Sequence, residues 1–314
     1  MFELTVDSDA RVRGTFVLAP GMHAVVGASG AGKTSLFRLI AGLDRSHNLM
    51  ARWGGQSLST LPPHSRSTAF VPQRPSLVPH RTIAQQVKWV AIDHTGPWNE
   101  WIDILDLGRH WLRYPAELSG GEQQRAALLR ALAADREILL LDEALSQIDP
   151  PHRLIIYRQL KTRLEPQRLL MFSTHHWSEA ETFAEAMLFI NDGEISGPVN
   201  ILEATPSNSA MAAIMGYVGS IPTPHGFLLI HPRMISLEDA AKSGFVIPGK
   251  GRQRRISPTT SAYQFEPLPP AKGRLLWTGT PVPDRESFDD IVVTHPVFAD
   301  FQFEDGNGID SQVM

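Results

Sequence analysis

The sequence predicts an α/β fold that carries a phosphate-binding loop near its amino end. Residues 138–142 and 168–173 are apolar runs, which read as strands buried on both faces of a parallel sheet. The stretch between them, residues 152–164, has a helical pattern, and strands that alternate with helices are typical of α/β proteins. A glycine-rich loop at residues 27–34 joins a predicted strand to a predicted helix, which is the arrangement that binds nucleotide phosphates.

The first elements of the chain surround this loop. Residues 2–6 and 11–18 are expected to be extended, and residues 23–26 form an apolar strand that leads into the loop. Helical periodicity then runs over residues 33–41. Gly42 is the expected end of that helix, because glycine readily adopts the left-handed conformation found at helix ends. The amino-terminal unit is therefore strand, phosphate loop and helix.

The rest of the chain divides into a helical region and a β-rich tail. After a short strand at residues 68–71, residues from about 75 to 135 look mostly helical. Beyond residue 218, prolines and glycines separate short β-like runs. A chain of 314 residues exceeds what one hydrophobic core usually organises. We expect two domains: residues 1–217, with a helical subdomain at about 75–135, and a small β-rich domain at residues 218–314.

The glycine-rich loop fits the Walker A pattern G-x-x-x-x-G-K-[ST]. Its glycines let backbone N–H groups approach the phosphates, Lys33 would neutralise the charge of the β- and γ-phosphates, and the Thr34 hydroxyl would ligate Mg²⁺. A structural glycine turn is the alternative, but the strand before the loop and the helix after it favour a phosphate site. The predicted phosphate-binding residues are Gly27, Ala28, Ser29, Gly30, Ala31, Gly32, Lys33, Thr34 and Ser35.

A second glycine motif, LSGGEQQR at residues 118–125, follows the helical region. Gly120 and Gly121 let backbone amides approach a phosphate, and the helix behind them would direct the positive end of its dipole at the same anion. The alternative is an ordinary helix start, with Ser119 as the N-cap and an acidic first turn. Taken alone, the motif leaves both interpretations open.

The apolar strand at residues 138–142 ends in two acids, Asp142 and Glu143. In a nucleotide-hydrolysing protein, one such acid holds Mg²⁺ and the other polarises the attacking water. We expect Asp142 to act through the metal and Glu143 to be the general base opposite the γ-phosphate. Without the Walker A loop, a strand that ends in Asp-Glu would more often be a helix cap.

These motifs together resemble those of ATP-binding cassette (ABC) ATPases, whose signature motif is similar to residues 118–125. Three more segments have counterparts in the family: Pro72-Gln73 resembles the Q-loop, residues 146–149 resemble the D-loop, and His175 matches the switch histidine. All of the motifs stand in the family's order. The resemblance covers about residues 2–217.

The resemblance implies roles for these residues. Gln73 would sense the metal and the attacking water, and His175 would contact the γ-phosphate. As a lone residue, either would be an ordinary surface or core side chain, and the adjacent His176 fits that interpretation better. The expected catalytic residues are Glu143, His175 and Gln73, the expected metal site is Thr34, Gln73 and Asp142, and the expected cofactors are ATP and Mg²⁺.

The resemblance also implies a head-to-tail dimer with a second copy of the chain. Ser119, Gly120 and Gly121 of one chain would close on the ATP that is held by the Walker A loop of the other. Asp149, in the D-loop, would communicate across the dimer. Each active site would then be composite, with residues from both copies.

Composition argues against several classes of protein. A formal net charge of -4 gives no electrostatic basis for binding nucleic acid, and the basic cluster at residues 250–255 is interpreted as a solvated loop. No apolar run reaches the roughly 18 to 20 residues that cross a bilayer, and the acidic start MFELTVDSDA is unlike a signal peptide. The absence of cysteine excludes disulfides and thiolate metal sites. We expect a cytoplasmic protein.

Further stretches resemble importer ATPases in particular. Residues 61–63 and 76–83 are similar to their L-P-P-x-x-R-x and L-F-P-H-x-T-V segments. Residues 229–237 are similar to the I-R-P-E-x-x-x-L opening of the regulatory β-domain in importers for molybdate, sulfate, iron, polyamines and sugars. This implies a peripheral ATPase on the cytoplasmic face of the inner membrane, bound to transmembrane permease subunits and indirectly served by a solute-binding protein. The compact helical region and short tail favour an oxyanion such as molybdate.

The sequence departs from the family's pattern at several positions. Ala144 replaces the proline that usually follows the Walker B glutamate, and Gln147 replaces an alanine in the D-loop. No clear aromatic residue stands where the family stacks adenine. Arg11 or Val12 lies near that place and Phe16 is a nearby alternative, so the mode of base recognition is left open.

Two other functions compete with transport. A soluble ABC protein could use the ATP-driven clamp to hold nucleic acid or another protein, but the single cassette, the importer-like tail and the lack of a basic footprint argue against it. A P-loop kinase is a weaker alternative, because the signature motif and His175 would then have no task.

Overall fold

The computed structural model describes residues 1–7, 11–91, 98–175 and 177–200, and further along the chain the backbone of the strands given below. The chain divides into two compact units, Met1–Ala204 and Thr205–Met314, which are described separately. The expected domain boundary between residues 217 and 218 lies outside the described residues and stays a prediction. None of the helices in the described ranges is long and apolar enough to span a membrane.

The centre of the first unit is a six-stranded sheet with the order β10-β9-β3-β8-β7-β6. β10 runs antiparallel to β9, whereas the other pairs are parallel. Every residue of β7 and β8 is buried, as expected for strands covered on both faces. The strands are β3 (Gly21–Val26), β6 (Thr68–Val71), β7 (Ile138–Asp142), β8 (Leu169–Thr174), β9 (Ala186–Asn191) and β10 (Glu194–Asn200).

A second, antiparallel sheet has the order β2-β1-β4-β5. Buried and exposed residues alternate along β1, so that Phe2 and Leu4 face inward. They share one hydrophobic core with Phe37 of the first helix and Leu140 of β7. The strands are β1 (Phe2–Val6), β2 (Gly14–Leu18), β4 (Leu49–Trp53) and β5 (Gln56–Ser57).

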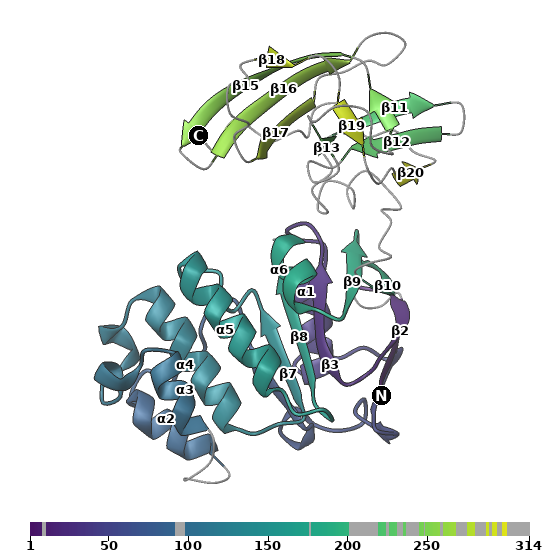
Figure 1. The fold of residues 1–314 in the computed structure, drawn as a ribbon. Coiled ribbons are helices and arrows are strands. Elements are labelled where there is room, and N and C mark those ends of the chain that lie inside the picture. Colours follow the sequence, from purple (N-terminus) through teal and green to yellow (C-terminus); the bar gives the residue numbers. More distant parts are fainter. Residues whose placement is uncertain are drawn as a thin grey trace. The chain divides into compact units, whose positions relative to one another are not determined.

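Helices flank the sheets, and α2, α3 and α4 gather on one side of the unit (Figure 1). The first helix ends where the sequence predicts, because Gly42 adopts a left-handed φ of 77° and closes its last turn. The α-helices are α1 (Lys33–Ala41), α2 (Ile83–Val90), α3 (Trp98–Ile104), α4 (Gly120–Ala133), α5 (Pro150–Arg163) and α6 (Trp177–Phe183). Short 3₁₀ turns are η1 (Pro63–Ser65), η2 (Gly108–His110) and η3 (Pro115–Glu117).

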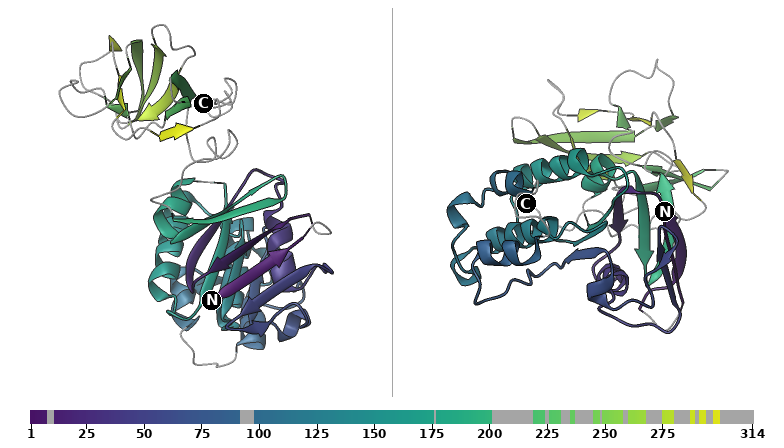
Figure 2. Two further views of the ribbon diagram at one scale, coloured as in Figure 1. Left: turned by 90° about the vertical axis from the view of Figure 1, so that its right-hand side faces the viewer. Right: turned by 90° about the horizontal axis from the view of Figure 1, so that it is seen from below.

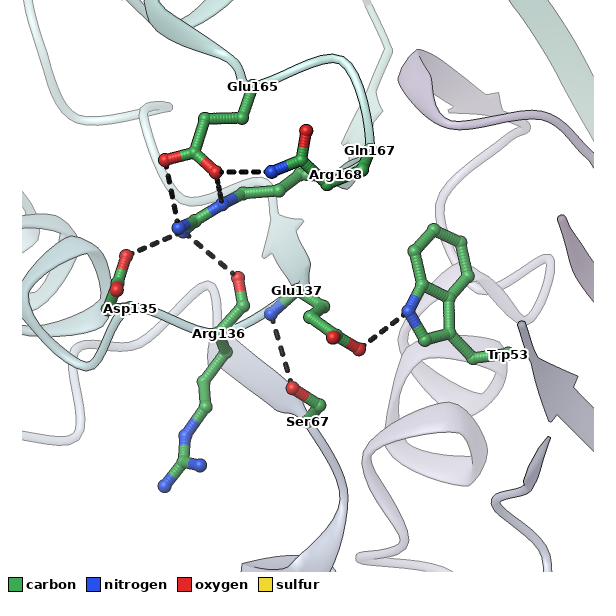
Figure 3. A network of polar contacts seen from close by, with 8 residues as sticks. All are labelled: Trp53, Ser67, Asp135, Arg136, Glu137, Glu165, Gln167 and Arg168. Carbon is green, nitrogen blue, oxygen red and sulfur yellow. Dashed lines mark hydrogen bonds and ion pairs between the residues drawn. The ribbon is translucent and has the colours of Figure 1, made fainter. Parts of the chain in front are cut away.

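A polar network holds the amino ends of the central strands (Figure 3). The indole N–H of Trp53, in β4, donates to Glu137 at 2.7 Å, and the backbone N–H of Glu137 donates to Ser67 Oγ at 3.3 Å. Arg168 pairs with Asp135 at 2.7 Å and with Glu165 at 3.0 Å. Ser67, Glu137 and Arg168 directly precede β6, β7 and β8, so the network fixes one end of the strands whose other ends carry the predicted site.

The second unit is β-rich, as the sequence predicts, and its strands form antiparallel pairs (Figure 2). Its strands are β11 (Gly219–Thr223), β12 (Gly226–Ile230), β13 (Ile235–Ser236), β14 (Phe245–Ile247), β15 (Gly249–Ser257), β16 (Thr260–Pro267), β17 (Leu275–Gly279), β18 (Ser287–Phe288), β19 (Ile291–Val293) and β20 (Val297–Ala299). The interpretation of residues 250–255 as a loop is wrong. They lie in β15, whose pairing with β16 satisfies the backbone that a loop would expose to water.

Candidate functional site

The predicted site residues converge on one edge of the central sheet. Strands β3, β6, β7 and β8 are parallel neighbours, so their carboxyl ends meet at the same edge. The Walker A loop follows β3, Gln73 follows β6, Asp142 ends β7, and His175 follows β8. A ligand at this edge would meet all of these segments.

The Walker A loop connects β3 to the amino end of α1. Lys33 is 5% exposed, and its Nζ donates to the backbone oxygens of Gly27 at 2.7 Å and Ala28 at 3.0 Å, so the side chain curls into the loop. Gly32 has a φ of 116°, and a Cβ there would lie 2.5 Å from Val12 Cγ1. Glycine is therefore required at this position. Ala28, Ser29 and Gly30 are exposed, which leaves the rim of the loop open to a phosphate.

Glu143 faces the loop from the end of β7. Its Oε1 lies 3.6 Å from Lys33 Nζ, and its Oε2 accepts a hydrogen bond from Gln73 Nε2 at 2.8 Å. The residue has a φ of 46°, a left-handed conformation that is uncommon and costly for a side chain other than glycine. The Ser173 hydroxyl accepts from the Glu143 backbone N–H at 2.8 Å and supports this geometry. Backbone strain of this kind is often stored at functional sites.

Asp142 is suited to bind a cation. The side chain is 2% exposed, the Ser173 hydroxyl donates to its Oδ1 at 2.8 Å, and its Oδ2 has no hydrogen-bond partner. Burial raises the pKa of this carboxyl above its usual value, while the Thr34 and Ser173 hydroxyls act in the opposite direction. A buried carboxylate oxygen with no partner, close to a hydroxyl, matches the oxygen ligands that Mg²⁺ prefers. The residues present therefore fit this metal.

Replacing Asp142 by asparagine should stabilise the nucleotide-free protein at neutral pH. The raised pKa means that the folded state binds the proton more tightly than the unfolded chain, whose value is 3.8. The stability that this proton contributes is complete below pH 3.8 and is lost as pH rises through the raised folded-state pKa. Asparagine has no carboxyl proton to lose, so Asp142→Asn is not destabilised in this way as pH rises. We expect its Tm at pH 7 to exceed the parental value, and the difference to shrink as pH falls.

Thermal unfolding measured across pH tests this expectation. Asp103→Asn, the same substitution at an exposed position of α3, serves as the control and should leave the Tm at pH 7 close to the parental value. Adding Mg²⁺ should raise the Tm of the parental protein more than that of Asp142→Asn. A variant no more stable than the parent at pH 7 would show that burial of this carboxylate carries no cost.

The signature segment forms the start of α4. Ser119 is its N-cap: the Ser119 hydroxyl accepts from the Glu122 backbone N–H at 3.4 Å, and Glu122 accepts from the Ser119 backbone N–H at 2.8 Å. These bonds hold the pKa of Glu122 below its usual value. A Cβ on Gly121 would lie 2.9 Å from the backbone oxygen of Gln147, so the glycines allow the D-loop to pack closely. Both interpretations of the motif remain compatible with this geometry, because the capped end is exposed.

Side-chain contacts from α5 and α6 fix the segments that carry His175 and Asp149. The Thr174 hydroxyl donates to Glu179 Oε2 at 2.7 Å, and Glu179 pairs with Arg153 at 2.7 Å, so α5 and α6 are tied to the residue before His175. His175 and Glu143 line the same small cavity of about 10 Å³. Asp149 caps α5 by accepting from His152 N at 3.1 Å. His176 lies outside the described residues.

One supporting residue of the site is not indicated by the sequence patterns. Ser173, which bonds both Asp142 and the backbone of Glu143, is the last but one residue of an apolar strand, and a polar residue there is its only sequence signal.

The candidates for base recognition differ in how exposed they are. Phe16 is 2% exposed and packs on Phe2 with ring centroids 6.0 Å apart, whereas Arg11 is exposed beside the loop.

Comparison with known proteins agrees with this geometry. A family model described as ABC transporter matches residues 16–146. A putative ATP-binding protein of Brucella suis is 30% identical over 254 residues, which cover 74% of this chain and 65% of that protein. The Fe(3+) ions import ATP-binding protein FbpC 2 of Rhizobium meliloti is 32% identical over 255 residues, 76% of this chain and 64% of that protein.

A further relative is the sn-glycerol-3-phosphate import ATP-binding protein UgpC of Burkholderia thailandensis, 35% identical over 218 residues, 63% of this chain and 58% of that protein. The chain spans about two thirds or less of the length of these relatives.

Among solved structures, a dimeric ATP-binding cassette in a post-hydrolysis state, bound to ADP and Pi, matches with a TM-score of 0.56 and 21% identity. The match covers 64% of this chain and 99% of that chain, and it shows that the first unit has the cassette fold. The family match, the import ATP-binding relatives and the ordered motifs at one sheet edge agree. The chain carries an ABC transporter ATPase domain over residues 16–146 and is similar to the ATP-binding proteins of importers.

Proposed function

We propose that this chain binds and hydrolyses ATP as the ATPase subunit of an importer. The observation that carries the proposal is the meeting of Lys33, Gln73 and Glu143 at the carboxyl edge of the sheet. A cationic P-loop residue opposite a carboxylate is the arrangement that cleaves a γ-phosphate by positioning and electrostatic stabilisation. The family and its named relatives support the same activity.

Each group has a chemical task in this proposal. The loop N–H groups and Lys33 bind the β- and γ-phosphates, and Glu143 takes the proton from the attacking water. Gln73 orients the Glu143 carboxylate through the hydrogen bond from its Nε2. Mg²⁺ bound by Thr34, Gln73 and Asp142 would neutralise phosphate charge. Glu143 has a left-handed φ at the end of β7, and its carboxylate contacts Lys33 and Gln73, which follow the neighbouring segments of the site.

A head-to-tail dimer completes the proposed site. The exposed amino end of α4 presents Ser119 and free backbone N–H groups, which suits the γ-phosphate of ATP bound to a second copy. His175, exposed beside the cavity that Glu143 lines, would contact the same phosphate from its own chain. Asp149, exposed at the start of α5, would face the partner's site.

The permease would dock on the helical region. Trp89, Leu112 and Tyr114 expose 62%, 76% and 45% of their surface there. The segment that carries Leu112 lies against the first turn of α2, because the Ile83 backbone N–H donates to the Arg113 backbone oxygen at 3.0 Å. Large apolar side chains exposed in one region mark protein-binding surfaces. This surface would receive a cytoplasmic helix of the permease and so bring the chain to the inner face of the membrane.

For the cargo we propose an oxyanion such as molybdate, delivered by a solute-binding protein. The compact helical region and the short β-rich tail support this choice. The relatives above are named for importing Fe(3+) ions and sn-glycerol-3-phosphate, which describes those proteins.

Purification of the tagged chain from detergent-solubilised membranes tests the proposal. We expect a transmembrane protein to be recovered with the parental chain, and much less of it with Leu112→Asp, because a charge would be buried at the interface. Leu154→Asp is the matched control, since Leu154 is 46% exposed on α5, away from α2. Recovery of a nucleic acid or a soluble protein in place of a membrane protein would favour the ATP-gated clamp.

A further inference from the structure

Gln124 is a buried amide at the centre of the site's framework. It lies in α4, one turn after the signature glycines, and its side chain is 0% exposed. Its Nε2 donates to the backbone oxygen of Gln73 at 3.3 Å and to Ser146 Oγ at 3.3 Å. Its Oε1 accepts from the Gln147 backbone N–H at 2.9 Å. One side chain thus bonds both the Q-loop and the D-loop from the signature helix.

The orientation of this amide is fixed by its partners. The backbone N–H of Gln147 can only donate, and the backbone oxygen of Gln73 can only accept. A flipped amide would set two donors against each other at Gln147 and two acceptors at Gln73. Gln124 therefore has one satisfied orientation, with both amide hydrogens and the amide oxygen engaged.

Both loops that Gln124 holds lead directly to groups with assigned roles. The side chain of Gln73 donates to Glu143 Oε2 at 2.8 Å, so the Gln73 backbone and the proposed general base are connected through one residue. Gln147 contacts the signature on its other side, where its side chain lies against Gly120 and its backbone oxygen against Gly121. The D-loop is consequently held between Gln124 and the signature glycines.

We propose that Gln124 is a positioning residue that couples the signature helix to the hydrolytic groups of its own chain. Because it is fully buried and its amide is bonded to Gln73, Ser146 and Gln147, it would act through these residues. When ATP of the partner copy moves the start of α4, Gln124 transmits that shift to Gln73, and through Gln73 to the carboxylate of Glu143. The proposal rests on the ATPase function and on the roles given to Gln73 and Glu143.

Steady-state hydrolysis by the full-length chain tests this coupling. Gln124→Met removes all three hydrogen bonds and keeps the side-chain length, and we expect kcat to fall by about 10- to 100-fold because the base is misplaced. The KM for ATP and the affinity for a fluorescent ATP analogue should stay within about twofold, since the Walker A loop is untouched. Ser146→Ala, at an exposed position, removes one acceptor of Gln124 and should lower kcat in the same direction by a smaller factor.

The matched control is Gln86→Met. Gln86 is an equally buried amide, 1% exposed, that bonds backbone groups of residues 78 and 81 and accepts from Arg130 Nη1, in the last turn of α4, at 3.3 Å. None of these bonds is to the Q-loop glutamine or the D-loop. Its kcat should stay within about twofold of the parental value. Parental kcat in both Gln124→Met and Ser146→Ala, or a loss confined to KM and nucleotide affinity, would overturn the proposal. If Gln124→Met does not fold, Ser146→Ala decides alone. A parental chain without ATPase activity would instead refute the proposed function.

Discussion

Glu143→Gln is expected to bind ATP, to accumulate as an ATP-bound dimer, and to hydrolyse ATP at least about 100-fold more slowly than the parent. The amide has nearly the shape of the carboxylate and can still accept the hydrogen bond from Gln73, so the local structure should persist. It cannot take a proton from water, and it loses the charge that lies 3.6 Å from Lys33 Nζ. Phosphate release and size-exclusion chromatography with ATP measure the two effects.

Glu3→Gln provides the comparison, because Glu3 lies on the exposed face of β1 and the same chemical change there should leave turnover and dimerisation unchanged. A Glu143→Gln chain that releases phosphate at the parental rate would contradict the assignment of the general base. Slow turnover without an ATP-bound dimer would contradict the composite site instead.

Ser119→Asp should abolish hydrolysis without unfolding α4. Aspartate is as good an N-cap as serine, so the capping interaction with the Glu122 backbone N–H should be retained. In a composite site, however, the new carboxylate would face the γ-phosphate bound by the partner copy and repel it. We expect turnover to fall by about 100-fold or more, with ATP binding to the monomer close to that of the parent.

Ser119→Asn separates the two interpretations of this residue. Asparagine also caps helices well and carries no charge, so its Tm should match that of Ser119→Asp while its turnover falls less. If Ser119 serves only as a helix cap, both variants should hydrolyse ATP like the parent. Thermal unfolding and turnover measured side by side distinguish these outcomes.

Local patterns predict the elements that build the site. Helix α1 starts and ends where periodicity, Lys33 and Gly42 place it. The position of the site at one edge of the sheet can also be predicted. Apolar strands that end in Asp142 and Thr174 have their carboxyl ends together when they are parallel neighbours. The sequence patterns do not predict strands β4, β9 and β10. β10 contains Pro198 and Gly197, which indicate a loop, yet it pairs with β9 through an irregular register.

The other features of the site depend on contacts between residues far apart in the chain, and no local sequence pattern predicts such contacts. Gln124 is one of two adjacent glutamines in the signature segment, and its partners Gln73 and Gln147 are 51 and 23 residues away. Nothing in the sequence distinguishes it from Gln123, which bonds the backbone of the preceding turn instead. The basic run in β15 likewise gives no local sign of a strand, because its pairing with β16 depends on residues further along the chain.

The composite site is tested most directly by mixing two inactive variants, Glu143→Gln and Ser119→Asp. In a mixed head-to-tail dimer, one site combines both defects, whereas the other combines the intact Walker A and Glu143 of one chain with the intact Ser119 of the other. Random pairing at equal amounts should therefore restore about a quarter of the parental sites, and with them ATP hydrolysis that neither variant shows alone. A mixture as inactive as its components would contradict a site shared between two copies.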